Sequence, residues 1–207
     1  MHNILITQKT FIDKHGQLNW SLENNWFKYF DKKRINLIPL NFNTNNKKKL
    51  LSLRPIGLIL SGGNDLYDKV RSKENLIRDN YEIKLLDLAI RNNIPVLAVC
   101  RGFQLVAKFF GSKITKTVNH VRSTHTLKIN NKKNELKTKV LKVNSYHNYA
   151  INNLPSFFDF TVKHSDGSIE IAKSNRYKIL SLMFHPERKN ISQKYINNIV
   201  FSHFKIK

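Results

Sequence analysis

The 207-residue sequence contains a single cysteine, Cys100, so an intramolecular disulfide is excluded. It has no stretch near the roughly 18 consecutive apolar residues that a membrane-spanning helix needs. The apolar run at its N-terminus is too short for the core of a signal peptide. Internal repeats and linker-like segments are missing as well. We therefore expect a soluble, cytoplasmic protein whose length suits one α/β domain with a sizeable core.

Acidic residues are scarce, because 14 Asp and Glu stand against 36 Lys and Arg, a formal net charge of +22. Such an excess is typical of proteins that bind nucleic acid or an anionic surface. The lysines, however, are spread along the chain, and many adjoin asparagines, as in residues 45–49 and 130–134. This pattern indicates a compositional drift toward Lys and Asn. We do not expect a nucleic-acid partner, but the charge would attract a small substrate that carries phosphates.

Short apolar segments alternate with helical ones as far as Gly111. The expected strands are Ile4–Ile6, Leu37–Leu40, Ile56–Leu60 and Pro95–Val99. The expected helices are Trp20–Phe30, Asp79–Asn93 and Phe103–Phe110. This alternation predicts a mostly parallel sheet with helices on both faces and right-handed crossovers.

Beyond Gly111 the pattern changes to short segments that are separated by polar loops, which predicts an antiparallel region. The strands expected there are Thr124–Asn130, Val140–Val143, Phe160–Lys163, Ile169–Ala172 and Ile179–Phe184, before a closing helix over Asn190–Phe204. Asp166 and Gly167 mark a turn. Two polar stretches, Thr44–Lys49 and Asn130–Lys139, are expected to be exposed loops or solvated faces.

The lone cysteine lies where a strand meets a helix. The apolar run Pro95–Val99 leads straight into Cys100, and helical periodicity begins within a few residues. An elbow of this kind exposes a nucleophile above the carboxyl edge of the sheet, and the helix N-terminus favours its thiolate. Gly102 suits a turn whose backbone approaches neighbouring segments closely. Most single cysteines are inert core residues, but this context predicts that Cys100 is a nucleophile.

Another expected strand ends in the triplet His185-Pro186-Glu187. Residues two apart in an extended segment point to the same side, so Glu187 can reach the His185 ring. A carboxylate on one ring nitrogen fixes the tautomer and leaves the other nitrogen to take a thiol proton. On its own, such a triplet is more often an exposed His–Glu pair than part of a catalytic site. Together with a candidate nucleophile, it predicts a base and the acid that orients it.

Two further segments carry residues that packing does not explain. After the strand Ile56–Leu60, the turn Ser61–Asp65 contains two glycines that let backbone N–H groups point into one cleft. The N–H groups of Gly63 and Arg101 would then form an oxyanion hole. The polar cluster Val143–Asn148 follows a short strand and has no apolar periodicity, which favours contacts to a ligand.

These segments resemble, in the same order, the motifs of the class I glutamine amidotransferases, within their γ-glutamyl hydrolase branch. The resemblance covers residues 4–204, and its five stretches are Leu60–Asp65, Ala98–Gln104, Val143–His147, Asp166–Glu170 and Phe184–Glu187. Five ordered matches are far more specific than any one of them. Two positions differ from the pattern: Ala98 stands where many members have Gly, and Asn148 stands where the branch often has a second His.

The resemblance implies a flavodoxin-like, doubly wound α/β fold with a small antiparallel region, in a single class I glutamine amidotransferase-like domain over residues 1–207. It implies a triad of Cys100, His185 and Glu187 that forms a γ-glutamyl thioester and releases glutamate, without a metal or a cofactor. The residues that it implies for binding the substrate or its oxyanion are Gly62, Gly63, Asn64, Arg101, Gln104, Ser145, Tyr146 and His147.

The leaving group has several alternatives in this branch, which acts on γ-glutamyl amines, polyglutamates and γ-glutamyl-CDP-amidate of capsule phosphoramidate synthesis. The positive charge favours γ-glutamyl-CDP-amidate, with Arg101, Arg122 or nearby lysines as phosphate contacts. The first alternative is a γ-glutamyl-amine (aminobutyrate-type) hydrolase. The second is a glutaminase subunit that donates ammonia to a synthetase partner, although these 207 residues hold no synthetase domain. A nucleic-acid-binding protein with a dead site is a third alternative, which the complete triad argues against.

Overall fold

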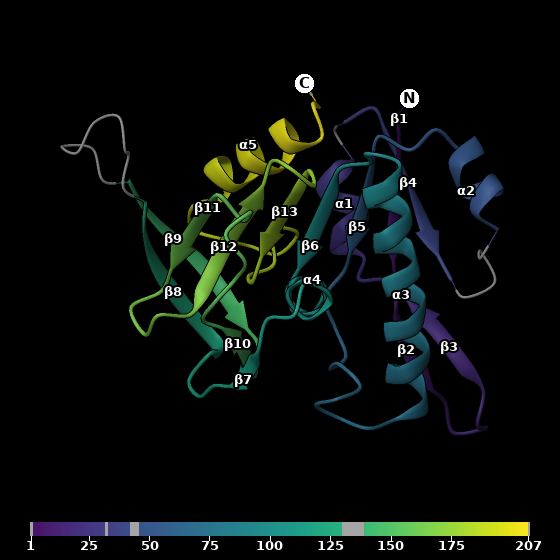
Figure 1. The fold of residues 1–207 in the computed structure, drawn as a ribbon, viewed down its shortest axis with the longest axis horizontal. Coiled ribbons are helices and arrows are strands. Elements are labelled where there is room, and N and C mark those ends of the chain that lie inside the picture. The colour runs from purple at the N-terminus through teal and green to yellow at the C-terminus, as the bar shows by residue number, and fades with distance from the viewer. Residues whose placement is uncertain (1, 32, 42–45, 130–138, 207) are drawn as a thin grey trace.

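The computed structural model describes residues 2–31, 33–41, 46–129 and 139–206 (Figure 1). A seven-stranded sheet runs through it. The strands lie in the order β11 (Phe160–Lys163), β12 (Ile169–Ser174), β13 (Ile179–Leu182), β6 (Val96–Val99), β5 (Gly57–Leu60), β1 (His2–Thr7) and β4 (Ile35–Leu40). Every pair from β13 to β4 is parallel, whereas β12 pairs antiparallel with both β11 and β13.

The two central strands are buried on both faces. Along β5, Leu58 and Leu60 belong to one core cluster, and Ile59 between them belongs to the other. Side chains alternate between the faces of a strand, so each face needs its own apolar residues. This explains why β5 and β6 appear in the sequence as continuous apolar runs.

Helices cover both faces of the sheet. Side chains of α2 (Lys47–Ser52), α3 (Lys73–Arg91) and α4 (Arg101–Phe109) form one cluster with the sheet, and those of α1 (Asn25–Phe30) and α5 (Gln193–His203) form the other. This arrangement confirms the predicted doubly wound α/β fold. Among the residues described, the structure contains no helix that is both long and apolar enough to cross a bilayer.

Three antiparallel ribbons accompany the main sheet. They are β2 (Lys9–Ile12) with β3 (Leu18–Ser21), β7 (Ile114–Lys116) with β10 (Tyr149–Ile151), and β8 (Val121–Ile129) with β9 (Lys139–Tyr146). The last pair extends the two strands that the sequence predicted, and Figure 1 shows it reaching away from the body of the molecule. The sequence did not indicate the first two ribbons, whose strands have only three or four residues each.

The helix predicted over Trp20–Phe30 was wrong in its first half. Trp20 lies on β3, opposite Thr10, and the helix begins only at Asn25. The turn of this hairpin is closed by Asp13, whose carboxylate accepts hydrogen bonds from the backbone N–H groups of residues 15 and 17. Pairing with β2 therefore overrides the helical spacing of the apolar residues in this segment.

Several element boundaries also differ from the prediction. The long helix begins at Lys73, six residues before the predicted Asp79, because Ser72 caps it by accepting a hydrogen bond from the Asn75 N–H. In the stretch Thr44–Lys49, predicted to be an exposed loop or a solvated face, residues 47–49 are exposed and begin α2, so they form a solvated face, and residues 44 and 45 lie outside the described residues. The second such stretch, residues 130–139, also lies outside them, except for Lys139, which is exposed and starts β9.

Candidate active site

Cys100 occupies a strained turn between β6 and α4. Its φ of 52° lies in the left-handed region that non-glycine residues rarely adopt. Its N–H donates to the carbonyl of Leu182 at 2.8 Å, which ties the turn to β13. At Gly102 a β-carbon would lie 2.2 Å from the Leu60 carbonyl oxygen, so only glycine allows this helix to approach β5. The elbow predicted from the sequence is therefore present.

The structure brings His185 and Glu187 to Cys100. His185 Nδ1 lies 2.7 Å from Glu187 Oε1, both side chains are buried, and the ring also interacts with Cys100. Burial by itself lowers the pKa of His185. The interaction with Cys100 and then the Glu187 carboxylate outweigh burial and raise this pKa to about 10. The imidazole is therefore protonated at neutral pH and is held between a sulfur and a carboxylate.

Two asparagines fix the backbone of His185. Asn144 accepts a hydrogen bond from the His185 N–H at 2.9 Å and donates to its carbonyl at 2.8 Å. Asn190 donates to the same carbonyl at 2.9 Å. Asn144 lies on β9, so the strand that was predicted to end before the polar cluster runs through it. The sequence pointed to Asn144 only as part of a cluster expected to contact a ligand, and its contact with His185, 41 residues away, was not predicted. Asn190 was not singled out at all.

The glycine turn packs directly against the candidate nucleophile and base. A β-carbon at Gly62 would lie 2.6 Å from His185 Cε1 and 3.5 Å from the Cys100 β-carbon. Gly63 has a φ of +80°, which glycine adopts without strain. The turn can therefore approach the two side chains only because it lacks side chains of its own.

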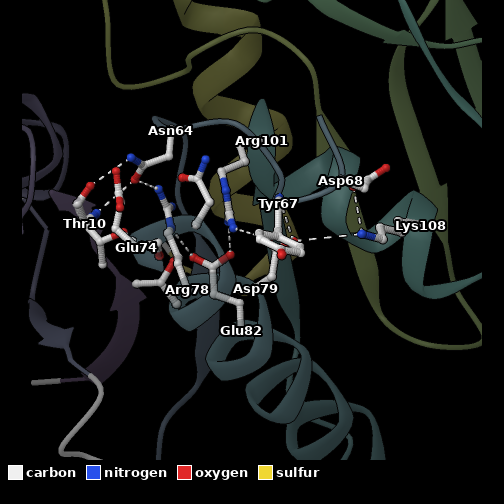
Figure 2. Close-up of polar contacts among 12 residues, drawn as sticks. Thr10, Asn64, Tyr67, Asp68, Glu74, Arg78, Asp79, Glu82, Arg101 and Lys108 are labelled. Carbon is white, nitrogen blue, oxygen red and sulfur yellow. Dashed lines mark hydrogen bonds and ion pairs between the residues drawn. The ribbon is translucent and has the colours of Figure 1, made fainter. Parts of the chain in front are cut away.

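Arg78, on α3, holds the carbonyl side of this turn (Figure 2). Its guanidinium is fully buried and donates to the carbonyl oxygens of Ser61 (2.8 Å), Gly62 (3.1 Å) and Gly63. In a trans peptide the C=O and the next N–H point in opposite directions. Because Arg78 binds the Gly62 carbonyl, the Gly63 N–H points away from it. This orientation fits the predicted oxyanion role of Gly63, whereas no pattern in the sequence pointed to Arg78.

Arg101 belongs to the same buried network. Its guanidinium, 1% exposed, pairs with Asp79 and Glu82, and Glu82 also binds Arg78 at 2.8 Å (Figure 2). The hypothesis that the Arg101 side chain binds phosphate is therefore wrong, because both of its terminal nitrogens are engaged inside the protein. Its backbone N–H remains a candidate for the oxyanion hole. Arg122, the other predicted phosphate contact, is exposed on β8 and does not line the cavities beside Cys100.

Asn64 fastens the turn to the N-terminal ribbon. Its Oδ1 accepts from the Thr10 N–H at 2.9 Å and from Arg78 at 3.0 Å, and its Nδ2 donates to the Thr10 carbonyl at 2.8 Å. These contacts use both lone pairs of Oδ1 and one of the two N–H groups of Nδ2, so Asn64 positions the turn. Asn64 also lines the cavity beside Cys100, and its contact with substrate stays a prediction.

Two adjoining cavities of about 260 Å³ each open beside Cys100 and share Gly63, His185 and Arg188. Most of the predicted site residues line one or the other. The residues that line the cavity on the Cys100 side are Gly63, Asn64, Asp65, Cys100, Arg101, Gln104, Tyr146, His147, Asn148, His185 and Arg188. The residues that line the other cavity include Lys9, Glu23, Gly62, His185 and Glu187. The two cavities thus gather residues from six separate sequence segments beside Cys100.

Ser145 is the predicted binding residue that does not reach these cavities. It is fully buried, and its hydroxyl donates to the His120 carbonyl at 2.6 Å. The prediction of a substrate contact at Ser145 is therefore not supported. Gln104 does line the cavity, and its amide nitrogen donates to the Tyr149 carbonyl at 3.1 Å. The same carbonyl lies 3.0 Å from His147 Nδ1.

Arg188 is a cavity residue that the sequence analysis did not select, although it directly follows the His-Pro-Glu triplet. Its guanidinium makes two-pronged contacts of 2.8–3.1 Å with Glu23 and lies 4.8 Å from the centre of the Tyr146 ring. Burial lowers its pKa, but the paired Glu23 outweighs this and raises it. Because Glu23 lies 165 residues away in the sequence, no local pattern pointed to the pair.

Comparison with known proteins agrees with this geometry. The family profile described as "Glutamine amidotransferase class-I" matches residues 10–203. A gamma-glutamyl-CDP-amidate hydrolase of Campylobacter jejuni is 31% identical over 194 residues, which cover 89% of this chain and 90% of that protein. A glutamine-hydrolysing GMP synthase of Prochlorococcus marinus is 28% identical over 172 residues, which cover 80% of this chain but 30% of the synthase.

Solved structures show the same fold. A glutamine amidotransferase from Thermotoga maritima superimposes with a TM-score of 0.68 at 18% identity, covering 99% of this chain and 82% of that one. At this identity the likeness concerns the fold alone. It agrees with the doubly wound arrangement that the strand order and the two core clusters show.

Proposed function

Because the chain belongs to the class I glutamine amidotransferase family and is an enzyme that hydrolyses carbon–nitrogen amide bonds, we propose that it cleaves γ-glutamyl amides through a thioester on Cys100. The observation that carries this proposal is the contact of three side chains. Cys100 sits on a strained elbow and interacts with His185, whose Nδ1 lies 2.7 Å from Glu187. A nucleophile, a base and an orienting carboxylate in this order are what acyl transfer requires.

The reaction follows from the positions of these groups. The Cys100 sulfur attacks the γ-carbonyl carbon, and the developing oxyanion accepts hydrogen bonds from the N–H groups of Gly63 and Arg101. His185, protonated at neutral pH, gives its proton to the leaving nitrogen, so that the C–N bond breaks and the thioester remains. His185 then takes a proton from water, the hydroxyl attacks the thioester, and glutamate leaves while the Cys100 thiolate and the protonated His185 are restored.

For the leaving group, we propose the CDP-amidate. The relative from Campylobacter jejuni that is named for this substrate matches nearly the whole chain. The net charge of +22 and the cationic side chain of Lys9, which lines a cavity beside His185, suit a leaving group that carries phosphates. Lys9 thereby replaces Arg101 and Arg122 as the proposed phosphate contact, because Glu23 already pairs with Arg188 in the same cavity.

Steady-state kinetics on three substrates would test the leaving group. Glutamate release is measured from γ-glutamyl-CDP-amidate, γ-glutamyl-aminobutyrate and glutamine, with Cys100→Ala as the inactive control. We expect the highest kcat/KM for the CDP-amidate. Equal or faster turnover of γ-glutamyl-aminobutyrate would instead assign the enzyme to γ-glutamyl amines.

A glutaminase subunit is the second candidate, because the similarity to GMP synthase covers 80% of this chain. Such a subunit would act on glutamine and donate the ammonia to a synthetase partner. Preference for glutamine in the same assay, together with a synthetase that co-purifies from the native cell, would establish it.

A further inference from the structure

Four buried side chains with metal-binding chemistry converge next to the active site. His120 precedes β8, His125 lies on β8, His147 follows β9, and Glu170 lies on β12. Their exposed fractions are 5%, 2%, 2% and 0%. The proposed reaction uses none of the four as acid, base or nucleophile. A group of three imidazoles and one carboxylate buried together needs a reason, because burying polar groups without partners is costly.

Their donor atoms lie at the separations of a coordination shell. His125 Nδ1 is 3.0 Å from Glu170 Oε1, His147 Nε2 is 3.4 Å from the same oxygen, and His120 Nδ1 is 3.3 Å from His147 Nε2. One donor atom from each residue falls within 4.8 Å of all the others. Zinc bonds of about 2.05 Å in a tetrahedron give donor separations of about 3.4 Å, close to the three shorter values.

In the neutral imidazoles, which are the forms that bind a metal, the outer hydrogen bonds determine which ring nitrogen presents a lone pair inward. His147 Nδ1 lies 3.0 Å from the Tyr149 carbonyl, which only accepts, so Nδ1 carries the hydrogen and Nε2 presents a lone pair. His120 Nε2 lies 2.8 Å from an Asp166 carboxylate oxygen, so its Nδ1 also presents a lone pair. These two lone pairs face each other at 3.3 Å. Metal-binding histidines have such outer partners, a carboxylate or a backbone carbonyl on the second nitrogen.

Glu170 adds a negative charge to these facing lone pairs. Glu170 places Oε1 against two of the rings, and its Oε2 is buried without a hydrogen-bond partner in the part of the chain that the structure describes. Lone pairs and a negative charge that face one point repel one another unless a cation or additional protons lie between them. A divalent metal ion would satisfy all four donors at once.

We propose that His120, His125, His147 and Glu170 form a binding site for Zn²⁺. Imidazole and carboxylate donors suit this ion, and a closed shell of four protein ligands is typical of structural zinc sites. The site goes beyond the proposed hydrolysis, and it departs from the expectation that no metal is involved. The ion would bind this chain without taking part in the cleavage of the substrate.

The position of the site indicates what it would do. Three ligands belong to the β8–β9 ribbon and its ends, and Glu170 belongs to the main sheet, so the ion would fasten the ribbon to the sheet. His147 also lines the cavity beside Cys100, and it shares the Tyr149 carbonyl with Gln104. The ion would therefore stabilise the cavity wall that carries Tyr146 and His147.

The test measures metal binding to the untagged full-length protein. After treatment with a chelator and dialysis, the protein is titrated with Zn²⁺ and, in parallel, with Co²⁺, whose visible absorption reports tetrahedral coordination. We expect one equivalent of each ion to bind, a tetrahedral Co²⁺ spectrum, and a rise in the thermal midpoint with Zn²⁺. Absence of stoichiometric binding in the wild-type protein would overturn the proposal, whatever the variants do.

Variants distinguish zinc that is bound at the proposed site from zinc that is bound adventitiously elsewhere. His125→Asn and Glu170→Gln should weaken Zn²⁺ binding by more than about 100-fold, and Asp166→Asn, which removes an outer partner, by about 10- to 100-fold. His203→Asn is the control, because His203 is a buried histidine on a different element, bonded to the Val96 carbonyl at 3.0 Å. Equal zinc binding by His125→Asn, Glu170→Gln and the wild type would contradict the assignment.

Discussion

At the residue scale, the site depends on positions where a side chain has no room. Gly62 and Gly102 each lie so close to their neighbours that a β-carbon would overlap them, His185 in one case and the Leu60 backbone in the other. Cys100 itself accepts an unfavourable φ to present its sulfur. Strain of this kind is retained where the surroundings determine the geometry of a functional group.

Gly62→Ala should inactivate the enzyme without unfolding it. The new methyl group would lie 2.6 Å from His185 Cε1 and would push the ring away from Cys100. A displacement of about 1 Å costs on the order of 100-fold in kcat, which steady-state kinetics would show. Gly111→Ala is the matched control, because nothing lies within 4 Å of its β-carbon and its positive φ affects stability alone. Equal activity of the two variants would contradict the predicted contact.

Glu187→Gln should lower the pKa of His185. The Glu187 carboxylate favours the protonated imidazole, and its removal takes away part of the interaction that raises this pKa to about 10. The alkaline limb of the pH–kcat/KM profile, where His185 loses the proton it must donate, therefore moves to lower pH. We also expect kcat to fall by at least about 100-fold because the ring loses its orienting group. A profile that keeps its alkaline limb would show that Glu187 does not act on His185.

At the scale of elements, α3 and α4 support the glycine turn from behind through buried charges. Arg78 on α3 holds three successive carbonyls of the turn, and Glu82 on the same helix links Arg78 to Arg101 on α4 (Figure 2). Breaking a buried pair leaves the remaining charges without compensation. The helices therefore position the oxyanion turn as well as cover the sheet.

Arg78→Lys should destabilise the protein by about 3 kcal/mol and lower kcat, because a lysine cannot reach Glu82 and three carbonyls with one ammonium group. Urea denaturation measures the free energy of unfolding. Arg91→Lys on the same helix is the control: its pair with Asp87 is exposed, and the change should cost less than about 0.5 kcal/mol. If the two variants were equally stable, the buried network would not support the turn.

At the scale of the whole molecule, the net charge of +22 should attract a phosphate-bearing substrate from a distance, before it binds. Increasing salt shortens the range of this field from about 10 Å at 0.1 M to about 3 Å at 1 M. The kcat/KM for γ-glutamyl-CDP-amidate should therefore fall several-fold across that range, and more steeply than for γ-glutamyl-aminobutyrate, which carries no phosphate. Equal salt dependence for both substrates would show that the positive field does not recognise phosphate.

The sequence predicts best what is local along the chain. His185 and Glu187 lie two residues apart, and Cys100 directly follows an apolar run, so their relation is visible without a fold. The continuous apolar runs of β5 and β6 predict a sheet that is buried on both faces. Because these strands alternate with helices, they are expected to be parallel, and the carboxyl ends of parallel strands lie together at one edge of the sheet.

What the sequence does not show depends on tertiary contacts. Arg78 contacts the glycine turn, in which Gly63 lies 15 residues earlier in the chain. Asn144 contacts His185, which is 41 residues away, and Arg188 contacts Glu23, which is 165 residues away. The segment around Trp20 has helical spacing but forms a strand because β2 lies beside it. Such contacts arise only when the elements pack.

The most direct test of the proposed chemistry is to detect the thioester by mass spectrometry of intact protein. The enzyme is mixed with γ-glutamyl-CDP-amidate, quenched with acid within the first turnovers, and digested to locate the modification. The account predicts a protein that has gained one γ-glutamyl group on Cys100, and neither this adduct nor glutamate release with Cys100→Ala. Glutamate release by Cys100→Ala at the wild-type rate would contradict it.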